Sequence, residues 1–211
     1  MIDPGPALDE HIDALVAELE TRGELAAILL THDHIDHSGA VAALQARSGA
    51  PVAAMRADAQ IRLADGVAVG PLTAIATPGH TRDHLAFIAG PVCFTGDAVL
   101  GAGSVFIAAD PGAMAGYLAA LRRLRAMDLE LLAPGHGPLV TDPGAKLDEY
   151  LAHRMEREHR LLGALADGLR DRDELLDRVW SEVSPALRGA AASTLEAHLA
   201  KLADEGRLPR G

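Results

Sequence analysis

The sequence predicts a mixed α/β (α+β) domain over residues 1–142, followed by a helical domain over residues 143–211. The first reason is the apolar run 25–30, because a strand that is apolar on both faces is normally covered on both sides. The second is a series of short apolar segments within residues 60–100, which glycine- and proline-containing turns separate. The third is the loss of strand signals beyond the first domain, where helical periodicity takes over.

The elements of the first domain are expected to alternate between helices and strands. Apolar residues at helical spacing predict a helix over Ala7–Glu20, which Gly23 ends. Asp110 and Pro111 are expected to open a later helix, because Asp suits the cap and Pro the first turn. The predicted order is helix 7–20, strand 25–30, polar loop 31–38, helix 39–47, strand 51–55, the strands of 60–100, helix 110–126 and strand 129–133. Helices near 143–168, 171–180 and 190–205 follow.

The composition excludes several classes of protein. With 49% hydrophobic residues, the chain of 211 residues is not globally disordered. Its apolar runs stop well short of the roughly 20 residues that a membrane-spanning helix needs, and its start does not resemble a signal peptide, so we expect a cytoplasmic protein without membrane contact. A formal charge of −11 disfavours a general nucleic-acid binder. The single cysteine, Cys93, lies in an apolar stretch and is expected in the core.

Metal-binding residue types cluster directly after the buried strand. Residues 31–37 read Thr-His-Asp-His-Ile-Asp-His. Imidazole nitrogens and carboxylate oxygens suit zinc and similar divalent ions. The donors of this segment are enough to begin two adjacent sites but too few to complete them. Further ligands must therefore come from other parts of the chain.

Three further candidates lie at predicted strand ends, each beside a glycine: His80, Asp97 and His136. Glycine lets the backbone approach a metal closely, and loops at strand ends would gather these residues at one rim of a sheet. Each segment by itself could equally be a turn, a helix cap or a polar loop. All four segments together, in this order, favour a metal centre.

These motifs together resemble the metallo-β-lactamase superfamily. They are Thr-His-x-His-x-Asp-His at 31–37, Pro-Gly-His-Thr at 78–81, Gly-Asp at 96–97 and Pro-Gly-His-Gly-Pro at 134–138. Residues 77–84, 94–97 and 152–159 are similar to the subgroup of β-lactamase-like protein 2. The resemblance implies an αββα sandwich, here abbreviated at its amino terminus, and a helical, winged-helix-like carboxy-terminal domain.

The resemblance also implies two divalent metal ions, for which zinc is the expected identity although manganese and iron can use the same donors. One ion would be held by His32, His34 and His80, the other by Asp36, His37 and His136, with Asp97 bridging the two. Two dications about 3.5–4 Å apart can share a hydroxide that acts as a nucleophile near neutral pH. Asp36 and Asp97 are therefore the catalytic candidates.

Other polar residues have two interpretations each. His84 could orient a metal ligand or shuttle protons in the active site, or it could be a hydrogen-bonded histidine at the start of a strand. Arg154 and Arg157 could contact a substrate phosphate or carboxylate, or they could lie on a solvated helix face paired with Glu156 and Glu158. His11 and His198, each alone on a polar helix face, are expected at the surface. Asp33 is expected to face solvent or to orient a neighbouring ligand, whereas Thr31 and Thr81 are expected to hold the loops through hydroxyl-to-backbone hydrogen bonds.

The resulting functional hypothesis is a dinuclear metal-dependent hydrolase. The subgroup resemblance implies single-stranded RNA as the substrate, whereas the acidic charge favours a small ester or thioester. The alternative is a truncated, non-catalytic module that binds RNA or protein and keeps its metal for stability.

The resemblance implies several strands before the segment that begins at Ile2, and we expect these first strands to be absent from this chain. A misassigned start codon, a second chain that fills the gap, or a shortened form with altered function would each account for this difference, and we favour the first for the natural gene product. An uncovered sheet edge or inner face favours association, so we expect a homo-oligomer or reduced stability for this polypeptide.

Overall fold

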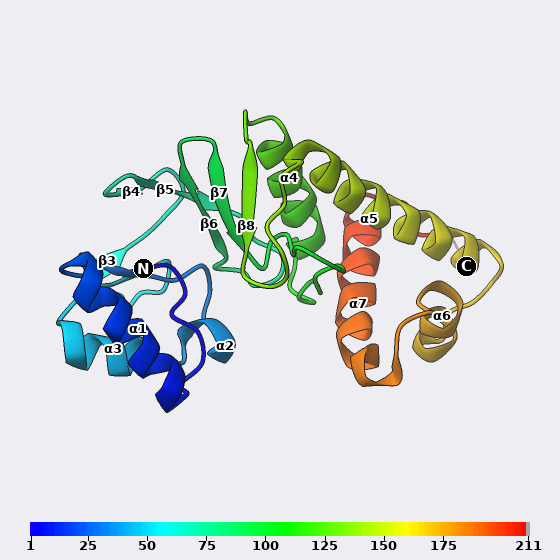
Figure 1. Cartoon of the computed structure of the whole chain (residues 1–211). Coiled ribbons are helices and arrows are strands. Elements are labelled where there is room, and N and C mark those ends of the chain that lie inside the picture. Colours follow the sequence, from blue (N-terminus) through cyan, green and yellow to red (C-terminus); the bar gives the residue numbers. More distant parts are fainter. Residues whose placement is uncertain (210–211) are drawn as a thin grey trace.

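A computed structural model describes residues 1–209 and shows two β-sheets packed between helices (Figure 1). The smaller sheet is parallel and holds β1 (Ile28–Leu29), β2 (Val52–Ala54) and β3 (Ile61–Arg62) in that order. The larger sheet holds β4 (Ala68–Val69), β5 (Leu72–Ala76), β6 (Leu85–Ala89), β7 (Val92–Gly96) and β8 (Leu131–Pro134), and its neighbours are antiparallel except for the parallel β7–β8 pair.

Three apolar clusters of side chains define the layers of the first domain. Leu29 and Ala53 of the smaller sheet meet Leu85 and Phe87 of the larger sheet, so the two sheets face each other. Helices α1 (Asp9–Arg22) and α3 (Val41–Ser48) cover the outer face of the smaller sheet. Helix α4 (Ala113–Arg125) packs on the outer face of the larger sheet, where Cys93 is fully buried as expected. The expected αββα sandwich is confirmed.

Local backbone preferences explain where the elements differ from their predicted bounds. The apolar run 25–30 contributes only the two-residue strand β1, which pairs with β2 at two positions, Ile28 opposite Val52 and Leu29 opposite Ala53. The loop 31–38, predicted to be irregular, contains one helical turn, α2 (Ile35–Ser38). The helix predicted from Asp110 begins three residues later, because Gly112 adopts a left-handed conformation with φ 77°.

The carboxy-terminal region is helical, as predicted. Asp142 accepts a hydrogen bond from the Ala145 backbone nitrogen at 2.9 Å and caps α5 (Pro143–Ala166), in which Pro143 occupies the first turn. Helices α6 (Arg172–Val179) and α7 (Arg188–Asp204) follow, with a short 3-10 helix at Pro185–Leu187 between them. Their apolar side chains form a separate core with the second half of α5. No helix within residues 1–209 is both long and apolar enough to cross a membrane.

Helix α7 connects this helical core to the sandwich. Ala197 belongs to the cluster around α4, whereas Leu195 and Leu202 belong to the helical core. The surface position expected for His198 is wrong, because its side chain is fully buried. The sequence pattern of α7 did not reveal that His198 is buried. Helix α7 packs against the sandwich on one side and against the helical core on another, so residues on more than one of its faces are buried.

Candidate metal centre

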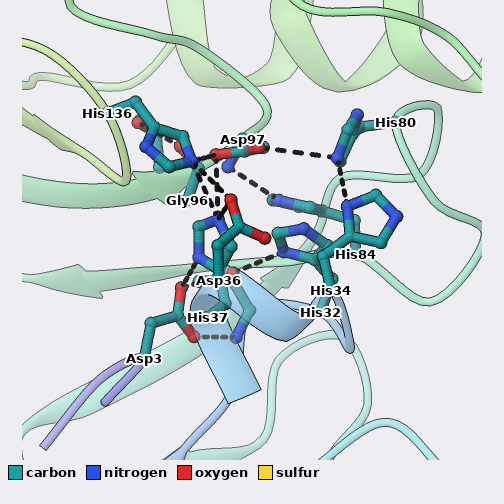
Figure 2. A network of polar contacts seen from close by, with 12 residues as sticks. Asp3, His32, His34, Asp36, His37, His80, His84, Gly96, Asp97 and His136 are labelled. Atoms are coloured by element: carbon teal, nitrogen blue, oxygen red, sulfur yellow. Dashed lines mark hydrogen bonds and ion pairs between the residues drawn. The ribbon is translucent and has the colours of Figure 1, made fainter. Parts of the chain in front are cut away.

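The candidate donors lie in four segments, each of which follows a β-strand. His32, His34, Asp36 and His37 follow β1, His80 follows β5, Asp97 follows β7 and His136 follows β8. These strand ends meet at one rim, and the side chains point toward one another (Figure 2). The structure therefore brings together all seven residues that the resemblance implies.

The first group of donors consists of His32, His34 and His80. One ligand atom from each lies within 4.8 Å of the others. The closest pair is Nε2 of His80 and Nδ1 of His34, which are 3.0 Å apart. On its other side, His80 donates from Nδ1 to the Phe106 carbonyl at 3.1 Å, so Nε2 presents its lone pair to the group.

The second group consists of Asp36, His37 and His136, whose ligand atoms also lie within 4.8 Å of one another. The Nε2 atoms of His37 and His136 are 3.2 Å apart, and Asp36 Oδ2 lies 3.2 Å from His136 Nε2. About half of the Asp36 and His136 side chains is exposed, whereas His37 is buried. This group therefore faces solvent on one side.

Asp97 lies between the two groups. Its Oδ2 is 3.5 Å from His80 Nε2 in the first group, and its Oδ1 is 3.4 Å from His37 Nε2 in the second. Its backbone nitrogen donates to Nε2 of His84 at 3.0 Å, and Nδ1 of the fully buried His84 in turn contacts Oγ1 of Thr77 at 2.7 Å. His84 thus holds the backbone that carries the central carboxylate.

Sequence reasoning missed Asp3. Its Oδ2 accepts hydrogen bonds from His37 Nδ1 at 2.8 Å and from the Thr31 hydroxyl at 2.6 Å, while Oδ1 accepts from the Thr31 backbone nitrogen at 2.8 Å. The same hydroxyl lies 2.9 Å from His32 Nδ1. Asp3 therefore orients one histidine of each group. The available signal was an acidic residue directly after two apolar ones and before a Pro-Gly turn.

Two glycines are required by the close approach of the loops. A Cβ atom at Gly135 would lie 2.7 Å from His37 Cε1 and 2.9 Å from Asp97 Oδ1. Gly96 has φ 48°, and a Cβ there would lie 2.6 Å from Thr31 Oγ1. Only glycine fits at these two positions, as the sequence pattern led us to expect.

The electrostatics of the centre favour a positive charge. Burial, aided by His37 and His80, lowers the pKa of His32 to about 3, so this ring is neutral at pH 7. Burial also acts to lower the pKa of His37, but the contacts with Asp3 and Asp97 outweigh it and raise this pKa to about 10. Burial acts to raise the pKa of Asp97, yet His37 and the other histidines lower it to about 2. The buried carboxylates therefore stabilise a cation among these donors.

The donor set fits a metal centre on three observations. Within residues 1–209, His32 Nε2 and Asp97 Oδ1 are buried without any hydrogen-bond partner. Buried polar atoms are normally hydrogen-bonded, and apart from ion-pair contacts such as that between Asp97 Oδ1 and His37 at 3.4 Å these two atoms are available to a cation. The lone pair on His80 Nε2 also faces Nδ1 of His34, and a cation between these two nitrogens would make their close approach favourable. Histidine and aspartate donors suit zinc or iron.

Arg154 and Arg157 do not lie on a solvated helix face, so that expectation is wrong. Arg154 is buried, donates to the Val105 carbonyl and lies 5.4 Å from the centre of the Tyr117 ring. Arg157 is buried against Trp180 and pairs with Glu182 and the Val179 carbonyl. Both guanidinium groups serve contacts within the fold. Asp33, inside the histidine motif, turns outward and pairs with Arg56 at 2.7 Å.

The αββα sandwich and its histidine-rich rim define a class of metal-binding proteins, and comparison with known protein families identifies that class. The chain belongs to the metallo-beta-lactamase superfamily, whose family model matches residues 1–70 and 60–136. A second model, the beta-lactamase associated winged helix domain, matches residues 172–210 and confirms the expected nature of the helical region.

Individual relatives agree with this assignment. The chain is 28% identical over 225 residues to the Beta-lactamase-like protein 2 homolog of Caenorhabditis elegans, a match that covers 98% of this chain and 75% of that protein. A metallo-beta-lactamase family protein from Thermus thermophilus superposes with a TM-score of 0.81 and 25% identity, over 100% of this chain and 86% of the other. A protein solved in a di-iron-bound form is 33% identical with a TM-score of 0.57, over 66% of this chain and 82% of the other.

Some relatives are considerably longer than this chain. The lactamase-like protein nscB of Arthroderma benhamiae is 32% identical over 209 residues, which cover 90% of this chain but 46% of that protein. The expected superfamily is confirmed, and the C. elegans relative bears the name of the subgroup that the motifs resemble.

Proposed function

We propose that this chain is a dinuclear metal-dependent hydrolase. The observation that carries the proposal is the convergence of two three-donor groups with Asp97 between them. His32, His34 and His80 would hold one divalent ion, and Asp36, His37 and His136 the other, with one oxygen of Asp97 directed to each. When bound, such a pair of ions activates water at neutral pH and polarises the bond to be cleaved.

The residues around the donors prepare the centre for this chemistry. Asp3 and Thr31 fix the rings of His32 and His37, and His84 holds the Asp97 backbone. The exposed faces of Asp36 and His136 leave an approach for substrate from solvent. Zinc is the metal we propose from the donor types, and iron is the competing identity because of the related di-iron protein.

We propose a small ester or thioester as the substrate class, because the charge and the surroundings of the centre favour it. The net charge of −11 disfavours a long polyanion, and Arg154 and Arg157 are occupied within the fold. Ile35 and Leu139, which neighbour the donors in sequence, are 75% and 62% exposed and offer apolar contacts to an acyl group. Single-stranded RNA is the second candidate, because winged-helix domains occur among nucleic-acid-binding folds.

The test compares two aspartates of the same motif. Asp36→Asn changes a proposed ligand, whereas Asp33→Asn makes the same substitution at an exposed residue that pairs with Arg56. We expect the wild type and Asp33→Asn to bind two metal ions per chain, and Asp36→Asn and Asp97→Ala to lose at least one. Hydrolysis should fall about 100-fold or more in these two ligand variants.

The assay uses thioesters, esters, lactams, phosphodiesters and single-stranded RNA, with metal content measured for every variant. Turnover of RNA alone would assign the substrate to the second candidate. Equal activity in wild type and Asp97→Ala, or one metal or fewer per wild-type chain, would reject the dinuclear hydrolase.

A further inference from the structure

The orientation of the His80 ring depends on a hydrogen bond to a backbone segment that belongs to neither a helix nor a strand. Its Nδ1 donates to the Phe106 carbonyl, which leaves Nε2 directed at the other donors. Residues 102–109 form neither helix nor strand, yet Val105 and Ile107 are 4% and 0% exposed. Buried backbone groups outside regular structure need partners from elsewhere in the chain.

Those partners come from α5 and α7 of the carboxy-terminal region. The Ile107 backbone nitrogen donates to the Thr194 hydroxyl at 3.1 Å, and the Ser193 hydroxyl donates to the Ile107 carbonyl at 3.0 Å. On the other side of Phe106, Arg154 donates to the Val105 carbonyl. Three side chains from two helices therefore hold both residues that flank Phe106.

The arrangement leaves the Phe106 carbonyl little freedom. Thr194 is 1% exposed, and its hydroxyl donates to the Ala190 carbonyl at 3.1 Å, so its remaining capacity is to accept from Ile107. The segment also returns to the His80 loop, since the Ala108 nitrogen donates to the Gly79 carbonyl at 2.9 Å. A displacement of residues 105–107 would therefore move the hydrogen-bond acceptor of His80.

We propose that Thr194, Ser193 and Arg154 are positioning residues for His80, so that the carboxy-terminal helices set the geometry of one of the two metal sites. The inference rests on the proposed metal centre. It assigns the helical region a role in metal binding, in addition to any contact with substrate. Because His37 and His136 make no contact with residues 105–107 in the hydrogen-bond network of residues 1–209, the effect is specific to the group that contains His80.

Thr194→Val removes the hydroxyl with little change in side-chain volume, whereas Thr194→Ser keeps the hydroxyl and removes only the methyl group. Cobalt(II) titration, followed by visible absorption and by competition with a chelator, reports the two sites separately. We expect Thr194→Val to weaken one of the two sites about tenfold and to leave the other unchanged, as is typical for residues that orient a ligand. Thr194→Ser should recover the wild-type affinity.

Thr21→Val is the matched control, because the Thr21 hydroxyl also donates to a backbone carbonyl, that of Glu18 at 2.8 Å, on the exposed surface of α1. It should change neither site. Ser193→Ala, at a half-buried position, provides a milder second variant if Thr194→Val does not fold. A folded Thr194→Val and a folded Ser193→Ala with wild-type affinities, or an equal loss at both sites, would overturn the proposal.

A metal-free readout separates this inference from the proposed function. Nitrogen-15 NMR of the imidazole reports which nitrogen of His80 carries the proton. We expect the Nδ1–H form in the wild type and in Thr194→Ser, and a mixture of tautomers in Thr194→Val. If the wild type shows these tautomers but hydrolyses none of the substrates, the hydrolase function fails and the positioning role stands. A pure Nδ1–H form in folded Thr194→Val contradicts the positioning role.

Discussion

Hydrogen bonds on the far side of each ring decide how the histidines present their nitrogens. His37 uses Nδ1 to contact Asp3, His32 uses Nδ1 to contact Thr31, and His80 uses Nδ1 to contact the Phe106 carbonyl. In all three rings, Nε2 is the atom left for the centre. These partners fix the orientation of the rings before any ion binds, which reduces the entropy lost on binding.

Asp3 provides the sharpest test at this scale. Asp3→Asn keeps the size of the side chain but offers one carbonyl oxygen where the carboxylate accepted three hydrogen bonds. We expect metal affinity to fall about 10- to 100-fold, because His32 and His37 lose their common anchor. Chelator competition measures this change. Unchanged affinity in folded Asp3→Asn, with Asp33→Asn as the control, would show that Asp3 does not position these ligands.

At the scale of elements, the strands are short and the loops that follow them carry the donors. The loop 134–138 illustrates the constraint, because it must pass against His37 and Asp97 without a side chain at Gly135. The rigid Pro-Gly-His-Gly-Pro sequence suits this path, since proline restricts φ and glycine removes the Cβ atom.

We expect Gly135→Ala to lower the free energy of unfolding by about 1–3 kcal/mol and to weaken metal binding, because its methyl group would overlap His37 Cε1. Gly163→Ala is the control, since a Cβ there meets no atom of residues 1–209 within 4 Å and the position lies inside α5. That substitution should stabilise the protein by about 0.5–1 kcal/mol. Urea unfolding measures both changes, and equal effects of the two substitutions would contradict the steric explanation.

Helices α5 and α7 are joined by a buried carboxylate. Glu158 is 1% exposed, lies 3.9 Å from His198 Nδ1 and contacts Lys201 at 2.7 Å as well as Arg207. His198, followed by Lys201 and Arg207, lowers the pKa of Glu158 from 4.5 to about 2. A carboxylate with a lowered pKa in the folded state stabilises the protein above its ordinary pKa and loses this contribution as it is protonated.

We therefore expect the stability that depends on Glu158 to be complete above about pH 4.5 and to be lost as the pH falls toward about 2. The measurement is urea unfolding between these limits for wild type, Glu158→Gln and Glu156→Gln. The exposed Glu156 on the same helix provides the control. The difference between wild type and Glu158→Gln should shrink at low pH, and a constant difference would contradict this role of the carboxylate.

At the scale of the whole molecule, the two sheets differ in width. The larger sheet has five strands and the smaller has three, so part of the inner face of the larger sheet faces a groove of about 630 Å³. Met1, Ile2, Leu72, Phe94 and Ala133 are among the residues that line it, and the groove continues to Asp36 and His37. Apolar surface of this kind favours association.

The homo-oligomer expected from the sequence remains a prediction, and the groove gives it a location. Light scattering coupled to size exclusion should detect a dimer or larger species whose share increases with concentration. Leu72→Ser, inside the groove, should weaken association about tenfold. Leu187→Ser, at an exposed position of the helical region, should not change it. A monomer at every concentration would contradict the prediction.

The sequence alone determined the superfamily, the layered fold, the helical carboxy-terminal region and the set of candidate donors. These features are local, since strand-end loops rich in histidine, aspartate and glycine can be recognised without knowing what they contact. Only the tertiary structure decided that Asp3 anchors two histidines, that Arg154 and His198 are buried, and that Thr194 reaches the segment behind His80. The physical reason is separation along the chain: Asp3 and Thr31 are 28 residues apart, and Ile107 and Thr194 are 87 residues apart. Local periodicity carries no information about such pairs, whereas packing of the layers brings them into contact.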